Sequence, residues 1–536
     1  MQPPDRGGVA QIRSSKNSIG CRLAAAAAYY LGPSKVVINP HNDKESKMPQ
    51  SSLSALPAEL LTEICSYLCS HCRCEAQGWR TTVFADFKND PYEFQTDAKS
   101  SVLQWEKAAL LNLSRTCRGL HIAAQPFLYH YYVQTSATFG LYSFVQTLLE
   151  RPDLQKRVVA VEVGRVDGLP AKHETDARPT PRCIAEALDM QLHGKVFCFT
   201  GHTHEKRREA AEYSALVSVL LRLVPNLEQA HFCLPIIVLF EAHIQLVPCL
   251  ASLKSLTFSN LERHFVLDMA APIIRLAPNL EVLHCHDCVD VTPRFSTSLG
   301  RKTPTDPPPL QNLLELGLTN TSLTPTDLRN LLSAVGPKLS KVDICRVGRQ
   351  VSQLDDDGEV VEFDEVLAAL RPWAETLREL LFLTSSRDGM ALPSPSHRLR
   401  GVNILPEFRA LKRLEAQAAF LDFYGDLGPK SEALTSILPP SVGSLRFWGY
   451  SRLTPALQGL VRAYQAGQYP DLRWIEIDDQ GFEESEPDGD PARELREVGD
   501  SFRSAGVHFV VCRDNHDDLD YVQRVITPSS GLLPES

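Results

Sequence analysis

Residues 313–318 read Leu-Leu-Glu-Leu-Gly-Leu and residues 339–344 read Leu-Ser-Lys-Val-Asp-Ile, two copies of a unit with apolar first, fourth and sixth positions. Successive copies begin 26 to 38 residues apart. Self-similarity at such a spacing indicates a repeat architecture, in which each unit packs on its neighbours. Nine copies occur, at 227–232, 253–258, 280–285, 313–318, 339–344, 377–382, 411–416, 442–447 and 472–477, with 158–163 as a candidate earlier member.

The segments between the units predict helices. Thr324-Pro325 opens an amphipathic stretch that Gly336-Pro337 closes, and Thr454 to Gly467 repeats this pattern. A hydroxyl cap followed by proline starts a helix, and glycine with proline stops one. The alternating apolar side chains within each unit predict a short strand, and a closing strand is expected at Gly506–Val511. The expected fold class is therefore α/β, with short parallel strands alternating with helices.

These units resemble irregular leucine-rich repeats. The resemblance implies a solenoid over residues 134–526, in which the strand face is the default surface for a protein partner, with a tail at 527–536. The unequal intervals imply loops, and we expect two of them at 303–309 and 355–365. Cys285 and Cys288 fit the frame of the repeat and are expected in the core.

A different pattern precedes the repeats. Leu56-Pro57-Ala58-Glu59-Leu60-Leu61 begins a helix whose apolar stripe continues to Leu68, with proline and glutamate suited to the first turn. A polar insertion at 69–107 interrupts the pattern. A second stripe runs from Leu110 to Ala124 and is expected to end at Pro126, before an aromatic segment at 127–133 that is either a strand or a packed loop.

The two halves together resemble the F-box, a small three-helix module, here over residues 51–133. The match departs from the family at the 39-residue insertion and at Leu120, where a tryptophan is common. The resemblance implies docking on the Skp adaptor of a cullin–RING ubiquitin ligase, and no catalytic residue is needed for that role. The residues implied in docking are Leu56, Pro57, Leu60, Leu61, Ile64, Leu68, Leu110 and Leu113. A helical cap that merely packs on the rest of the chain remains the alternative.

Composition limits the remaining classes of function. The chain has 536 residues and a formal charge of −10, which disfavours general binding to nucleic acid. Its 14 scattered cysteines indicate reduced thiols and an intracellular protein, in the cytoplasm or nucleus, and no apolar run is long enough to cross a membrane. Residues 1–50 are expected to be a disordered tail.

A search for catalytic and metal-binding motifs yields little. Cys65, Cys69, Cys72, Cys74 and His71 are dense enough for zinc, but their spacing matches no known finger, so no metal or cofactor is expected. No phosphate-binding loop, dinucleotide fingerprint or nucleophile elbow occurs. The sequence therefore predicts a non-catalytic substrate receptor of a ubiquitin ligase, with unassigned substrate-binding residues. The alternative is a leucine-rich-repeat scaffold outside any ligase.

Overall fold

The structure is a computed structural model of the chain, and its described elements, from helix α2 to strand β14, belong to one unit at Pro57–Ser536. The described residues are 56–69, 72, 107–134, 139–163, 216–233, 248–259, 265–301, 303, 306–319, 321, 323–345, 363–383, 402–417, 431–448, 453–479 and 491–513. The expected tails and most of the 69–107 insertion lie outside them.

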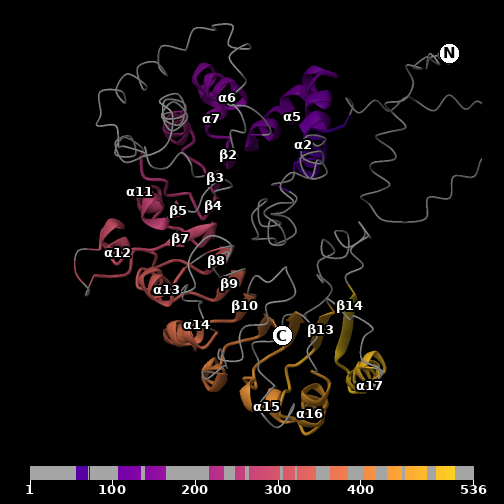
Figure 1. The fold of residues 1–536 in the computed structure, drawn as a ribbon. Helices are drawn as coiled ribbons and strands as arrows, with labels where there is room; N and C mark the ends of the chain where they lie inside the picture. Colours follow the sequence, from indigo (N-terminus) through magenta and orange to yellow (C-terminus); the bar gives the residue numbers. More distant parts are fainter. Residues whose placement is uncertain are drawn as a thin grey trace, which may run out of the picture. The chain divides into compact units, whose positions relative to one another are not determined.

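A 12-stranded parallel sheet forms the centre of this unit. Its strands follow one another in chain order and the sheet is open, with β1 at one edge and β14 at the other (Figure 1). Two short strands, β5 (Phe265–Val266) and β7 (Cys288–Asp290), pair separately. The strands of the large sheet are β1 (Tyr131–Val133), β2 (Ala160–Val163), β3 (Gln229–Cys233), β4 (Ser255–Ser259), β6 (Val282–His286), β8 (Glu315–Thr319), β9 (Lys341–Cys345), β10 (Glu379–Leu383), β11 (Arg413–Gln417), β12 (Ser444–Trp448), β13 (Trp474–Asp479) and β14 (His508–Arg513).

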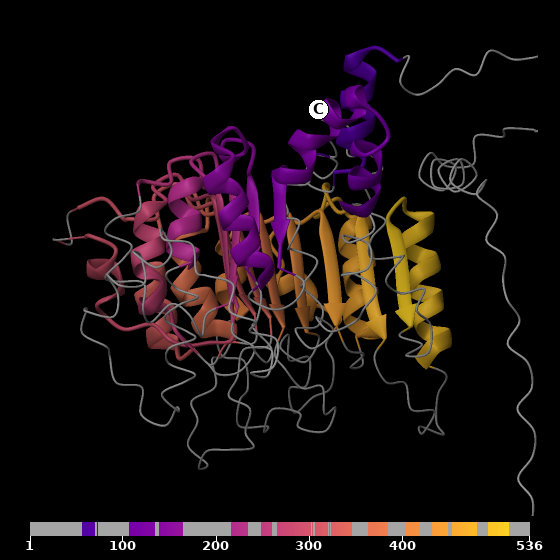
Figure 2. The ribbon, with the colours of Figure 1, turned by 90° about the horizontal axis from the view of Figure 1, so that it is seen from above.

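Helical segments alternate with these strands and line one face of the sheet (Figures 1 and 2). The expected α/β class is confirmed. None of the described helices is both long and apolar enough to span a membrane. The α-helices are α2 (Ala58–Tyr67), α5 (Arg118–His130), α6 (Phe139–Glu150), α7 (Pro152–Gln155), α11 (Ala271–Leu276), α12 (Phe295–Ser298), α13 (Pro325–Leu332), α14 (Phe363–Leu370), α15 (Ala433–Ile437), α16 (Thr454–Gln465) and α17 (Pro491–Ser504), with further helices at 107–114 and 216–223. The 3₁₀ turns are η5 (Leu267–Ala270), η6 (Arg371–Trp373) and η7 (Val402–Glu407).

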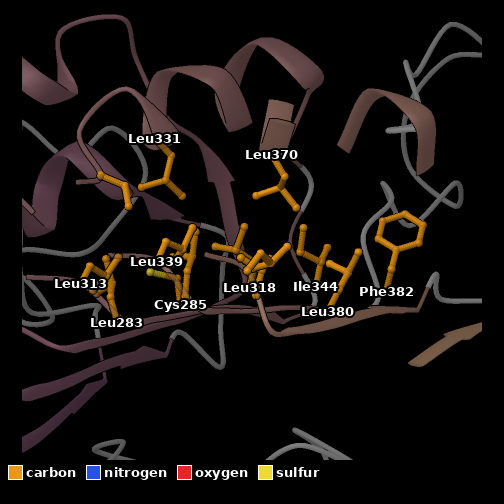
Figure 3. Close-up of a cluster of buried hydrophobic side chains, with 14 of the residues drawn as sticks. Leu283, Cys285, Leu313, Leu318, Leu331, Leu339, Ile344, Leu370, Leu380 and Phe382 are labelled. Atoms are coloured by element: carbon orange, nitrogen blue, oxygen red, sulfur yellow. The ribbon is translucent and has the colours of Figure 1, made fainter. Parts of the chain in front are cut away.

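The strand register places equivalent positions of the predicted units side by side. Leu283 pairs with Leu316, which in turn pairs with Val342, so the fourth positions form one continuous buried row. The first and sixth positions are buried as well, and the strands and helices share one core (Figure 3). The fourth positions are Val161, Ala230, Leu256, Leu283, Leu316, Val342, Leu380, Leu414, Leu445 and Ile475. Cys285 and Cys288 are buried, as expected.

The helix signals correspond to real helix starts. The Thr324 hydroxyl accepts a hydrogen bond from the Asp327 backbone N–H and the Asp327 carboxylate accepts one from the Thr324 N–H, which is a capping box. Helix α16 also starts at its predicted signal, but Thr454 is the first residue of the helix and Leu453, which has no capping side chain, is the N-cap, so the expected hydroxyl cap is wrong there. The helix is followed by Gly467 with a φ of 78°, as the glycine signal predicts. The closing strand β14 begins two residues later than expected and reaches Arg513.

The N-terminal helices form a separate small core. Leu61 and Cys65 of α2 pack with Leu110, Leu113 and further residues from the helix at 107–114 and from α5. We call residues 56–69 and 107–130 the helical module.

One expectation for the helical module is wrong, because α5 does not end at Pro126. The helix continues to His130, and Phe127 and Leu128 pack against the module core. That packing offsets the backbone hydrogen bond that proline cannot donate. The aromatic segment is thus helix up to His130 and strand β1 from Tyr131.

Candidate functional site

The residues predicted to dock on the Skp adaptor divide into two groups. Leu61, Leu110 and Leu113 are buried in the module core, where they support the helices. Ile64 and Leu68 are half-buried, and the exposed members are Leu56, Pro57 and Leu60. Only the exposed and half-buried residues can contact a partner directly.

Helix α2 has a second apolar stripe beside the one that packs on the module core. Leu60 and Tyr67 lie seven residues apart, about two turns, and so share a face of the helix, with Ile64 between them. Leu60 is 45% exposed and Tyr67 is 61% exposed. In the described part of the chain, the exposed large hydrophobic residues are Leu56, Leu60, Tyr67, Leu111 and Ile122, all at or in the helical module, and Met269 in η5. A local concentration of exposed apolar side chains marks an interaction surface.

The sheet face opposite the helices carries polar side chains, and we call it the polar face. Its residues come from the third, fifth and seventh positions of the units, because side chains alternate across a strand. Their neighbours on this face come from adjacent strands, which from β3 to β13 are 26 to 38 residues away in the chain.

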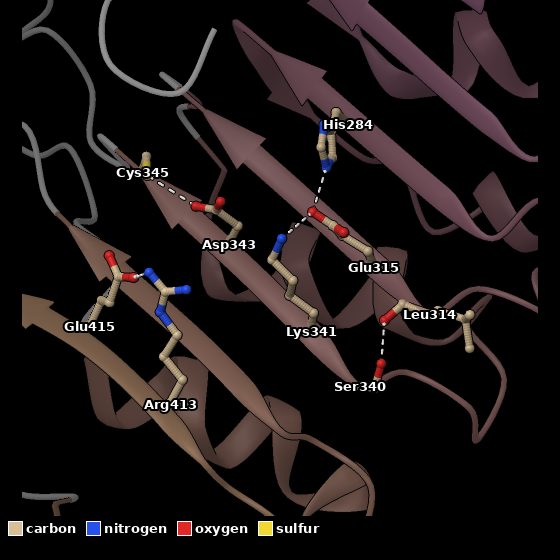
Figure 4. Close-up of polar contacts among 9 residues, drawn as sticks. All are labelled: His284, Leu314, Glu315, Ser340, Lys341, Asp343, Cys345, Arg413 and Glu415. Atoms are coloured by element: carbon tan, nitrogen blue, oxygen red, sulfur yellow. Dashed lines mark hydrogen bonds and ion pairs between the residues drawn. The ribbon is translucent and has the colours of Figure 1, made fainter. Parts of the chain in front are cut away.

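Glu315 is the centre of a network on the polar face (Figure 4). Its Oε1 atom lies 3.1 Å from His284 Nε2 and 2.6 Å from Lys341 Nζ. Burial alone would raise the pKa of Glu315, but the hydrogen bond and charge of His284, with the charge of Lys341, lower it well below its usual value. The carboxylate therefore stays ionised and connects strands β6, β8 and β9.

Charged pairs continue toward the C-terminal strands. Arg413 pairs with Glu415 within β11 (Figure 4), and Arg446 Nε of β12 lies 3.3 Å from Glu476 Oε1 of β13. On β9, Cys345 donates to Asp343 Oδ1 over 3.1 Å.

The polar face is more open at its C-terminal end. His231, His284 and His286 are buried on the earlier strands, whereas Arg413 and His508 are exposed. The half-buried Trp474 ring lies beside the His508 ring, with 4.0 Å between the centroids. Aromatic and arginine side chains in such positions are frequent anchors of protein interfaces.

Glu162, His231 and Ser259 lie in the order of an acid–base–nucleophile relay. The His231 Nε2 atom is 2.9 Å from Ser259 Oγ, and its Nδ1 atom is 3.7 Å from Glu162 Oε1. The second distance exceeds a hydrogen bond, and Ser259 is only 3% exposed, which leaves no room for a substrate at its hydroxyl. The geometry fits a structural polar row better than a nucleophilic centre.

The structure also brings together Cys69 and Cys72, two members of the cysteine cluster seen in the sequence, and His130, which the sequence did not relate to them. Their ligand atoms all lie within 4.8 Å of one another, and Cys72 Sγ is 3.3 Å from His130 Nδ1. Hydrogen bonding from Cys72, opposed by burial and aided by His130, lowers the pKa of Cys69 to about 4. Cys65 is not part of this set, because it lies in the module core, where burial raises the pKa of its thiol to about 11. His71 and Cys74 lie outside the described residues.

The two loops predicted at 303–309 and 355–365 are partly described. In the first, residues 303 and 306–309 lie outside any helix or strand, as expected. In the second, residues 363–365 form the first turn of α14, so the expected loop is wrong at that end, and its other residues lie outside the described ones.

Comparison with known proteins gives no assignment, because no protein-family model and no curated protein matches the chain.

Proposed function

We propose that the protein is a non-catalytic substrate receptor of an SCF-type ubiquitin ligase. In this proposal the helical module is an F-box that docks on the Skp adaptor, and the sheet with its helices is a leucine-rich-repeat solenoid that holds a target protein. The observation that carries the proposal is the exposed stripe of Leu60 and Tyr67 on α2, within the segment that resembles the F-box.

The stripe needs a partner for a physical reason. A soluble helix normally has one apolar face, which packs on its own core. Helix α2 already uses Leu61 and Cys65 for that purpose, so Leu60 and Tyr67 add apolar area exposed to water. Burying such side chains on a partner gives about 25 cal/mol per Å² of apolar area.

The proposed receptor acts by proximity. The docked module would hold the chain near the ubiquitin-charged enzyme, and the polar face would hold the target, so that transfer to a target lysine becomes local. Trp474, His508, Arg413 and Arg446 on the open end of the polar face are the proposed target contacts.

The test is a pull-down of the full chain with purified Skp adaptor. Leu60→Asp with Tyr67→Asp should remove binding, because both side chains are exposed and their replacement spares the module core. Met269→Asp is the matched control, an exposed hydrophobic residue (39%) outside the helical module. If the Skp adaptor retained the double variant as well as the wild type and Met269→Asp, the assignment of the docking face to Leu60 and Tyr67 would be contradicted.

One observation favours the alternative, a repeat scaffold with an N-terminal cap. Helix α5 runs directly into β1, and β1 pairs with β2, so the module is continuous with the edge of the sheet. A scaffold of this kind would fail to bind the Skp adaptor. Deletion of residues 1–130, which keeps β1, would then destabilise the sheet strongly.

A further inference from the structure

Cys69, Cys72 and His130 form a compact group of nitrogen and sulfur ligands at the end of the helical module. Cys69 and Cys72 follow α2, and His130 is the last residue of α5. The two cysteines are separated by two residues, a spacing common in zinc sites, while the histidine comes from 58 residues further along the chain.

We propose that Cys69, Cys72 and His130 bind one zinc ion that ties the end of α2 to the end of α5.

The distances suit a tetrahedral ion. Zinc bound to sulfur and nitrogen at its usual bond lengths would place neighbouring ligand atoms roughly 3.5–3.8 Å apart. The observed Cys72 Sγ to His130 Nδ1 distance is 3.3 Å, and all three ligand atoms lie within 4.8 Å of one another. The longer ligand distances need to shorten by up to about 1 Å to complete the geometry, with the fourth position left to another ligand such as water.

The surroundings suit a metal complex without net charge. Cys69 is buried and Cys72 and His130 are half-buried, so the group lies at the edge of the module rather than in open solvent. The Lys107 ammonium is near enough to Cys69 to interact with it electrostatically, and it lies 5.2 Å from the centre of the Tyr131 ring. Two thiolates and one Zn²⁺ have no net charge, so a nearby lysine does not oppose the ion.

The site would add stability where the module needs it. The helical core is small, and its two sequence halves are separated by the insertion at 69–107. A bound metal that links both halves exists only in the folded module and so contributes its binding energy to folding.

The experiment measures metal on the full chain and does not depend on ligase binding. The chain is purified with a thiol reductant, equilibrated with zinc and passed through a desalting column, and its zinc is measured by mass spectrometry. We expect one zinc per chain, and with Co²⁺ in place of zinc we expect a thiolate-to-cobalt charge-transfer band. Cys72→Ser and His130→Asn should each reduce the bound zinc at least tenfold and weaken the cobalt charge-transfer band.

Two matched variants serve as controls. Cys117→Ser and His121→Asn change a cysteine and a histidine of the same module outside the group, and both should keep the zinc. Less than a tenth of an equivalent of zinc on the reduced wild-type chain would overturn the proposal. Equal zinc on Cys72→Ser and Cys117→Ser, or a Cys69–Cys72 disulfide that persists under reductant, would overturn it as well.

Discussion

The His284 Nε2 atom on β6 lies 3.1 Å from the Glu315 Oε1 atom on β8, inside the polar face. The same oxygen accepts a hydrogen bond from Lys341 on β9, so one carboxylate holds partners on both neighbouring strands. Buried charges are tolerated when they are paired in this way. The central strands are therefore joined by side chains as well as by backbone hydrogen bonds, and this makes stability depend on pH.

Glu315→Gln should remove an acid-sensitive part of the stability. The folded pKa of Glu315 lies below its ordinary value of 4.5, so its carboxylate stabilises the fold above that pH. The contribution disappears as the pH falls below 4.5 toward the folded pKa. We expect Glu315→Gln to lower the free energy of unfolding by about 2 kcal/mol at pH 7. The difference should become smaller in acid, and urea unfolding midpoints measure it. A constant loss at every pH would contradict this role.

His286→Gln should change the pH dependence in a different window. Burial, aided by His284 and His231, lowers the pKa of His286 from 6.5 to about 3, so the folded protein keeps it neutral. Between these values the unfolded chain binds a proton that the folded chain does not, and stability falls with decreasing pH. Between pH 6 and 5 we expect the free energy of unfolding of the wild type to fall by up to about 1 kcal/mol per pH unit. His286→Gln should not show this fall. If the free energy of unfolding depended on pH in the same way in the wild type and in His286→Gln, a neutral His286 would be contradicted.

Replacement by alanine should affect stability in opposite ways at Gly459 and at Gly119. A Cβ at Gly459 in α16 would lie 1.4 Å from the Ser431 carbonyl oxygen, so the helix can approach that backbone only without a side chain. Gly459→Ala should cost about 2 kcal/mol or more. A Cβ at Gly119 in α5 meets nothing within 4 Å, so Gly119→Ala should be neutral or gain about 0.5 kcal/mol. Thermal unfolding of the two variants checks both signs.

Trp474→Ala should separate target binding from ligase binding. The Trp474 ring lies beside His508 on the open end of the polar face, far along the chain from α2. We expect the variant to lose proteins that proximity labelling finds with the wild type when the proteasome is blocked, while Skp adaptor binding is unchanged. An unchanged set of labelled proteins would place the target contacts elsewhere.

The strands of the repeat units could be predicted because each unit carries its own signal, whereas β1 lies in a segment that the sequence left open between a strand and a packed loop. Leu316 and Val342 occupy the same position of their units, and the register pairs them directly. The short strands β5 and β7 could not be predicted, since two or three residues such as Phe265–Val266 carry no periodicity.

The sites were harder to predict because their members are distant in sequence. His284 and Glu315 are 31 residues apart, and Cys72 and His130 are 58 apart. No local pattern relates such pairs. The continuation of α5 past Pro126 was missed because the packing of Phe127 and Leu128, which outweighs the proline, is a tertiary effect.

The most direct test of the central proposal is hydrogen–deuterium exchange of the full chain with and without purified Skp adaptor. We predict slower exchange on addition of the adaptor in Ala58–Tyr67 and at 107–130, and no change in strands β3 to β14. The Leu60→Asp, Tyr67→Asp variant should show no protection, and Met269→Asp should show the same protection as the wild type. Unchanged exchange in the helical module at saturating adaptor, or protection confined to the sheet, would contradict the account.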